Sequence, residues 1–393
     1  MLYSLPYFKG SFLYAGSVSL YAVREITINL FEIPSGMVAD TFGRKRSLVF
    51  SFLAYIFSFL LFYTAEVFGL FLIAFILYGT GDAFRSGTHK GMIMDYLRRR
   101  GWSGEKISYY GHTRAWSQRG SAVSALIAGS ILFFRGNYSQ VFLFSTVPYA
   151  LNLLLVLSYP RELGPVRRSE EKRFYAIKRT YKAFIASMRD IRVFTLINHT
   201  ALHSAYMRAV KDYIQPFMLH VAILAPLLPG VSREQQNGLT IGLFYFLIYI
   251  LTAFASQHAN AFLTKKKTLI ISVTLFSGLG FGVLCGVFAQ FSLWSAALLA
   301  FLMIYIVENI RKPILTGFVA DRVKGEYLTS VLSAQSLLKT MMTAVIALLT
   351  GIFADLFGIG ISLLVVSSLL IGGVLILYAG AALLSQKKNG KSA

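Results

Sequence analysis

The chain has 393 residues, of which 56% are hydrophobic and only 14% are charged, and its mean hydropathy is +0.62. A soluble domain carries about 25% charged residues, so this composition excludes an ordinary soluble protein. The formal charge of +21 does not indicate nucleic-acid binding, because the basic residues occupy alternate loops and form no continuous basic face. The composition predicts a polytopic helical membrane protein.

Apolar segments of about 20 residues recur along the chain, and each can cross a hydrocarbon core of about 30 Å as a helix. Helices satisfy their own backbone hydrogen bonds in lipid, which open strands cannot do. We expect an all-α membrane protein with twelve spans, the first of them short and interrupted by Pro6 and Lys9. The expected spans cover residues 1–14, 18–39, 47–64, 67–96, 112–134, 138–159, 193–219, 237–262, 268–289, 292–319, 329–353 and 359–384.

Basic residues gather in every second loop, as the positive-inside rule requires of cytoplasmic loops. These clusters are Arg44 to Arg46, Arg98 to Arg100, residues 161–192, Lys265 to Lys267, Arg322 with Lys324, and the tail at Lys387 and Lys388. The intervening turns are short and almost uncharged. We therefore expect an integral protein of the inner or plasma membrane, with both termini in the cytoplasm.

Residues 160–192 break the apolar pattern with prolines and many basic residues. Apolar residues recur there at helical spacing, opposite Lys178, Lys182 and Arg189. This pattern predicts an amphipathic helix along the inner membrane surface, attracted by anionic lipid. The linker would join two pseudo-symmetric six-helix bundles, residues 1–159 and residues 193–393, the second ending in the basic tail.

The loop after the second expected span carries the most specific motif, GMVADTFGRK from Gly36 to Lys45. Gly36 permits a close approach of helices, Asp40 can interact with the N-terminus of a neighbouring helix, and Gly43 permits a tight turn. We expect Arg44 and Lys45 to anchor the loop at the inner lipid headgroups.

This spacing of glycines, aspartate and basic residues resembles the loop between the second and third spans of major facilitator superfamily transporters. Thr41 stands where the family usually has an arginine. The resemblance implies a central cavity between two six-helix bundles, alternating access by rocking, and drive from an ion gradient, often of protons. It also implies that Gly36, Asp40, Gly43, Arg44 and Lys45 form a conformational gating loop.

Ionisable residues inside the expected spans are the candidates for substrate binding or ion coupling. Each costs about 2.5–3.5 kcal/mol at the middle of a membrane helix, so we expect these residues to face the protein interior. Asp82 lies three residues before Arg85, and Glu308 lies three residues before Arg311, so each pair can neutralise itself. The alternative is that such pairs only hold helices together. The candidates are Glu32, Asp82, Arg85, His89, Glu308 and Arg311.

Away from their ends, the fourth and tenth expected spans together carry more bases than acids, which favours an organic anion or a zwitterion as the substrate. The bases are Arg85, His89, Lys90, Arg311 and Lys312, and the acids are Asp82 and Glu308. We expect a monomeric secondary active transporter of a small organic solute, coupled to protons or another ion. We expect no enzymatic activity, no cofactor, no resident metal and no nucleic-acid partner.

Two alternatives stay open. His199 and His203 lie one helical turn apart and can share a divalent cation, which would make the protein a metal transporter. A receptor or an enzyme on the same scaffold is the other alternative, although the sequence shows neither a nucleophile triad nor a soluble catalytic domain.

The topology predicts two labelling groups for single cysteines introduced into a Cys285→Ser background. Cysteines replacing Arg98, Lys178 or Lys265 should react with an impermeant reagent from one side of the membrane. A cysteine replacing Gln290 should react only from the other side. Labelling of position 290 together with the basic loops would contradict the twelve-span arrangement.

Overall fold

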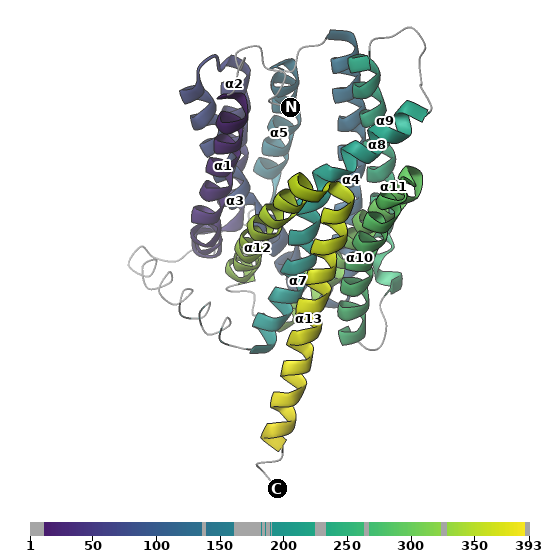
Figure 1. Cartoon of the computed structure of the whole chain (residues 1–393). Helices are drawn as coiled ribbons and strands as arrows, with labels where there is room; N and C mark the ends of the chain where they lie inside the picture. The colour runs from purple at the N-terminus through teal and green to yellow at the C-terminus, as the bar shows by residue number, and fades with distance from the viewer. Residues whose placement is uncertain are drawn as a thin grey trace.

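The computed structural model describes residues 12–135, 139–160, 191–224, 233–262, 267–323 and 328–389, with three isolated positions at Lys182, Ile185 and Arg189. Throughout these ranges the regular structure is helical, which confirms the all-α expectation (Figure 1). The long helices are α1 (Phe12–Phe42), α2 (Arg44–Thr64), α3 (Phe68–Arg99), α4 (Lys106–Arg135), α5 (Ser139–Ser158), α7 (Ile191–Val210), α8 (Ile214–Leu224), α9 (Arg233–Gln257), α10 (Lys267–Gln290), α11 (Trp294–Arg322), α12 (Leu328–Phe357) and α13 (Ile359–Asn389).

The N-terminal part of the structure differs from the expectation. Helix α1 is continuous from Phe12 to Phe42, so no loop at residues 15–17 separates the first two expected spans. Gly16 and Ser17 do not stop this helix, since a single glycine costs a helix interior only about 1 kcal/mol. The described ranges contain eleven long helical segments when α7 and α8 are counted as one, so twelve spans are not confirmed.

The expected amphipathic linker falls almost entirely outside the described residues, as do residues 1–11. Within the described part of the chain, seven helices are long and apolar enough to cross a membrane, namely α2, α3, α5, α9, α10, α12 and α13. Helices α1, α4, α7 and α11 are absent from this set, and they carry polar groups such as Glu32, Arg114, His203 and Glu308 that point toward neighbouring helices.

The helices form two packed groups that touch along two seams. Helices α1, α2, α3 and α5 pack together on one side of the molecule, and α7, α10, α11, α12 and α13 pack together on the other (Figure 1). One seam joins α12 to α1 and α3. At the second seam, α4, which follows α3 in the chain, packs along much of its length against α9, and α9 contacts α11 of the second group. Polar groups of α1 and α3 therefore meet polar groups of α7, α11 and α12 at the centre.

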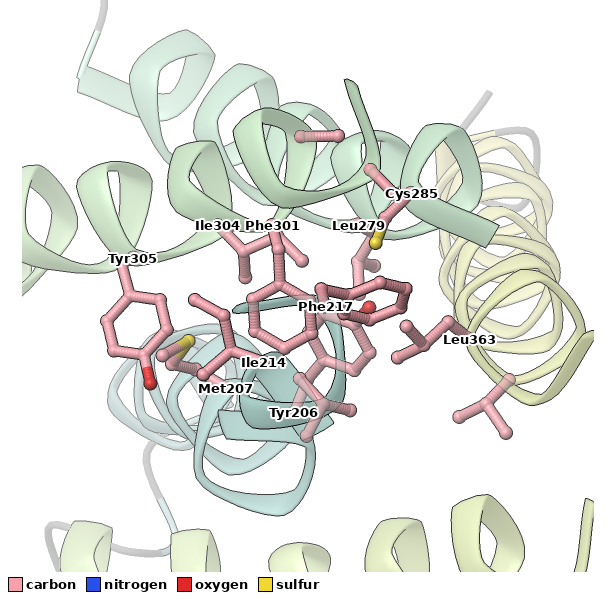
Figure 2. Packing of buried hydrophobic residues seen from close by; sticks show 14 of the residues in the cluster. Tyr206, Met207, Ile214, Phe217, Leu279, Cys285, Phe301, Ile304, Tyr305 and Leu363 are labelled. Atoms are coloured by element: carbon pink, nitrogen blue, oxygen red, sulfur yellow. The ribbon is translucent and has the colours of Figure 1, made fainter. Parts of the chain in front are cut away.

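A large apolar core holds the second group together. Figure 2 shows Phe217 and Tyr206 packed against Phe301 and Ile304 of α11, with Leu363 of α13 closing the cluster. The Tyr206 hydroxyl hydrogen-bonds to Ser367 Oγ at 2.7 Å, so the one polar atom of this aromatic side chain is satisfied. This packing positions α7, whose site residue His203 has its ring against that of Tyr206.

The contact between α10 and α13 depends on glycine. A Cβ at Gly286 would lie 2.6 Å from the Gly360 carbonyl oxygen and 2.7 Å from Leu364 Cβ. Gly280, on the same helix, has no atom within 4 Å of the corresponding position.

We expect Gly286→Ala to lower the free energy of unfolding by about 1–3 kcal/mol, because it forces two backbones apart. Gly280→Ala is the matched control and should leave stability unchanged or raise it by up to about 1 kcal/mol through helix propensity. Thermal unfolding of both variants in one detergent checks this. Equal midpoints for the two variants would contradict the packing described for Gly286.

Candidate functional site

The connection between α1 and α2, within the motif from Gly36 to Lys45, is a single residue long. Gly43 separates α1 from α2 with a φ of 105°, a conformation that L side chains rarely adopt. Arg44, the first residue of α2, donates to Asp40 at 3.0 Å and reaches Asp95 of α3 at 3.2 Å. Gly36 is buried in α1, next to Ser35, whose hydroxyl donates to the Ala83 carbonyl of α3 at 2.9 Å.

The two basic residues of the loop contact protein groups. The Arg44 side chain is only 11% exposed and lies between two carboxylates. Lys45 Nζ donates to the carbonyl oxygens of Leu157 and Tyr159 at 2.9 and 2.7 Å. A helix leaves its last carbonyls unpaired, so Lys45 caps the end of α5. The loop therefore ties α1, α2, α3 and α5 into one unit.

We expect Asp40→Asn and Gly43→Val to impair transport while leaving the protein inserted. Asparagine removes the ion pair with Arg44, and valine resists a positive φ. Thr41→Ala should be mild, because the buried Thr41 hydroxyl has no hydrogen-bond partner among the described residues. Uptake into vesicles, normalised to inserted protein, measures all three. A Thr41→Ala defect as large as that of Asp40→Asn would show that this loop works differently.

Asp82 and Arg85 of α3 form an ion pair at 2.9 Å. The Tyr55 hydroxyl of α2 donates to Asp82 at 2.8 Å and accepts from Arg85 Nε at 3.2 Å. Tyr55 in turn packs against the rings of Tyr78 and Tyr149. The pair is thus held by a buried aromatic cluster and stands at one side of the central site.

Glu32 of α1 is fully buried where α1, α3 and α12 meet. Ser86 of α3 hydrogen-bonds to Oε1, while Oε2 has no hydrogen-bond partner within the described ranges. The Lys339 ammonium of α12 attracts this carboxylate across the seam. His89 is half-buried one turn beyond Arg85, and its charged neighbours are Arg85 and Lys90.

The expected Glu308–Arg311 pair is wrong. Glu308 is bonded by His203 Nδ1 at 2.8 Å and by Ser204 Oγ at 2.6 Å, both on α7, and Lys312 Nζ lies 3.6 Å away. Lys312 at i+4 therefore takes the place that Arg311 at i+3 was expected to fill. The two positions point in different directions around α11, and spacing alone did not distinguish them.

Arg311 instead joins α11 to its neighbours. It is 1% exposed and donates to the Ile271 carbonyl oxygen at 2.8 Å and to Thr274 Oγ1 at 2.5 Å, both on α10. It also donates to the His199 carbonyl oxygen of α7 at 3.0 Å. Hydrogen bonds to three acceptors satisfy most of the guanidinium, so this residue is a structural tie between helices.

Three lysines that the candidate set omitted surround the centre of the site. Lys90 of α3, Lys312 of α11 and Lys339 of α12 line one small cavity of about 30 Å³, which has room for a water molecule or two. Lys339 is the only charged residue of its expected span, residues 329–353. An isolated charge in a membrane helix is costly, and this cost was the sequence signal that could have marked Lys339 as a site residue. The rest of the lining consists of Arg311, Gln335, serine and threonine hydroxyls, and the apolar side chains of Ala201 and Leu315.

Polar side chains also bridge the two helix groups beside this cavity. Arg208 Nη2 of α7 donates to both carboxylate oxygens of Glu25 of α1, at 2.8 and 3.0 Å. Arg114 and Gln118 of α4 both donate to Asn309 Oδ1 of α11, at 3.0 and 3.1 Å. The sequence did not reveal these contacts, because each joins residues far apart in the chain.

We call the end of the molecule that carries Arg98 to Arg100 the basic end. Contacts between α3, α4 and α11 close the protein at this end. Arg98 Nη2 donates to the carbonyl oxygens of Ala320 and Val323 at 3.1 and 3.0 Å, at the C-terminus of α11. Lys106 at the start of α4 pairs with Asp321. An apolar cluster that includes Met94, Leu97, Phe318 and Leu332 fills the space between these contacts and the cavity.

The histidine pair does not assemble a metal site in the described part of the chain. His203 is buried and uses Nδ1 on Glu308. Among the described residues, no group of three or more His, Cys, Asp or Glu side chains converges on one point.

Comparison with known proteins identifies the family. The family model of the Major Facilitator Superfamily matches residues 3–210, more than half of the chain. This protein therefore belongs to the Major Facilitator Superfamily.

An uncharacterized transporter of Buchnera aphidicola subsp. Schizaphis graminum is 27% identical over 243 residues, 61% of this chain. The match spans 54% of that relative, about half its length.

Solved structures share the fold. The human organic anion transporter MFSD10 superposes with a TM-score of 0.64 at 16% identity, over 91% of this chain and 82% of its own. A bacterial homologue of the iron transporter ferroportin, in an outward-facing state, gives a TM-score of 0.66 at 16% identity, over 97% and 94% of the two chains. At these identities the likeness extends to the fold alone.

Proposed function

We propose that this transporter moves a small organic solute with negative charge by alternating access, coupled to protons or another ion. In this proposal residues 1–159 and 193–393 act as two bundles joined by the basic linker 160–192. Both termini lie in the cytoplasm, and the basic end faces the cytoplasm as the positive-inside rule requires. The protein works as a monomer in the inner or plasma membrane.

The observation that supports the proposal best is the charged site where the two helix groups meet. Lys90, Lys312 and Lys339 outnumber Glu32 and Glu308 there, while Asp82 is already paired with Arg85. Ionisable residues at membrane depth are costly, and those lining an internal cavity usually mark a transport path. A cavity with surplus positive charge favours an anionic solute.

Two carboxylates are the proposed proton carriers. Glu32 has one oxygen without a hydrogen-bond partner among the described residues, and it faces the lysines of the cavity. Glu308 lies between His203 and Lys312, so a rearrangement of either partner would change its proton affinity. Glu32 lies on α1 at its seam with α12, and Glu308 lies on α11, which also contacts α4, so a rocking motion would alter the surroundings of both.

Substitutions at Asp82 and Arg85 test whether the site acts in transport. The protein is reconstituted into lipid vesicles, and the vesicles are loaded with a metabolite extract. Mass spectrometry then identifies the solutes that exchange across the vesicle membrane. We expect Asp82→Asn with Arg85→Gln to fold and insert but to lose most of this exchange. Each single neutralisation should lower stability more than the double change, because it leaves one charge within a membrane helix unpaired.

Lys211→Gln is the matched control, since that side chain is exposed outside the site. Its exchange should equal that of the unsubstituted protein. A well-folded and fully active Asp82/Arg85 double variant would remove the pair from the mechanism and leave it a structural tie.

A further inference from the structure

The three lysines of the cavity have more charge and more hydrogen-bond donors than their neighbours can use. Lys339 Nζ donates to Ser336 Oγ at 3.3 Å, and Lys312 Nζ lies 3.6 Å from Glu308 Oε1. Lys90 makes no hydrogen bond or ion pair with any residue that the structure describes. Both oxygens of Glu308 are already bonded by His203 and Ser204.

The ammonium groups also repel one another. Lys90, Lys312 and Lys339 line one small cavity, so their like charges lie close together. Glu32 attracts Lys90 and Lys339 but carries a single charge. The cavity is thus a preformed site with unsatisfied positive charge, and three helices from both sides of a seam contribute to it.

We infer that this cavity binds a phosphate monoester group, and that the solute moved under the proposed function is a small organic phosphate. The inference rests on that proposed function. A phosphate monoester bears close to two negative charges near neutral pH on three acceptor oxygens, all within one compact group. Three ammonium groups that converge from different helices match such a group in both charge and direction.

A carboxylate fits the cavity less well. Arginine binds the planar carboxylate in a bidentate manner, whereas lysine acts on phosphate as a point charge. Arg85 is engaged by Asp82 and Tyr55, and Arg311 by the oxygens of α7 and α10. The cavity of about 30 Å³ would have to widen to admit either group, so the choice of phosphate rests on the ammonium groups and not on the volume.

Serine and threonine hydroxyls are placed to complete the binding of such a group. Thr316 of α11 and Ser336 of α12 line the same cavity as the lysines, whereas Thr200 and Ser204 of α7 already donate their hydroxyl protons to the Ile197 carbonyl oxygen and to Glu308. Hydroxyls can donate to phosphate oxygens that the ammonium groups leave free. A bound phosphate would draw α3 toward α11 and α12, because its ligands come from all three helices.

The test measures binding to purified full-length protein in nanodiscs of zwitterionic lipid, by calorimetry and thermal shift. The probes are inorganic phosphate, glycerol 3-phosphate and phenyl phosphate. Dimethyl phosphate, acetate and succinate serve as singly charged or carboxylate comparators, and dioctanoyl phosphatidic acid represents a lipid headgroup. We expect at least one soluble monoester to bind at least tenfold more tightly than every comparator.

Lys90→Gln, Lys312→Gln and Lys339→Gln should each weaken monoester binding tenfold or more, with Lys211→Gln unchanged. Removing one charge from a repelling cluster should not prevent folding, and Lys339→Met provides a second neutral variant. The probe panel on the unsubstituted protein tests the inference without any variant.

Equal or tighter binding of succinate, binding of the phosphatidic acid alone, or unchanged affinity in all three glutamine variants would overturn the inference. Exchange of a solute without phosphate, together with no monoester binding, would overturn it while the proposed transport function stands. Monoester binding without any exchange of solute would instead contradict the transport function and keep the binding site.

Discussion

The cost of placing charge in a membrane determines where the polar residues of this protein lie. In the hydrocarbon interior, each ionisable side chain must find a partner within the protein or line a polar cavity. The structure meets this requirement by turning the polar faces of α1, α3, α7, α11 and α12 toward one another. The outer helices are left with apolar surfaces, as exposed leucines and isoleucines on α5, α9 and α12 illustrate. One constraint thus accounts for both the central site and the lipid-facing surface.

Much of the fold was predictable because it follows from hydrophobic length. The expected spans from residue 47 onward correspond to observed helices within a few residues at most of their ends. The positive φ of Gly43 was also predictable, since the loop between two long helices allows only a sharp turn. Composition could not predict that α1 continues through Gly16 and Ser17, because those residues permit both a loop and a helix.

The site was only partly predictable, and the reason is geometric. Asp82 and Arg85 form an ion pair because they are neighbours on one helix face, and the Tyr55 hydroxyl hydrogen-bonds to both side chains. Glu308 and Arg311 have the same spacing, but His203 and Ser204 on α7 offer Glu308 better partners. Which partner prevails depends on how α7, α10 and α11 pack, and no local pattern in the sequence encodes that packing.

Arg98 closes the basic end through main-chain acceptors, and this has a consequence for how the closure can change over evolution. Its guanidinium binds the carbonyl oxygens at positions 320 and 323, which every amino acid supplies. Drift in the side chains at these two positions therefore leaves the acceptors in place. The neighbouring link between Lys106 and Asp321 is different, because both of its partners are side chains and either can be lost by a single codon change. The Arg98 contact is therefore insensitive to substitutions at positions 320 and 323, whereas a single substitution at position 106 or 321 can remove the ion pair.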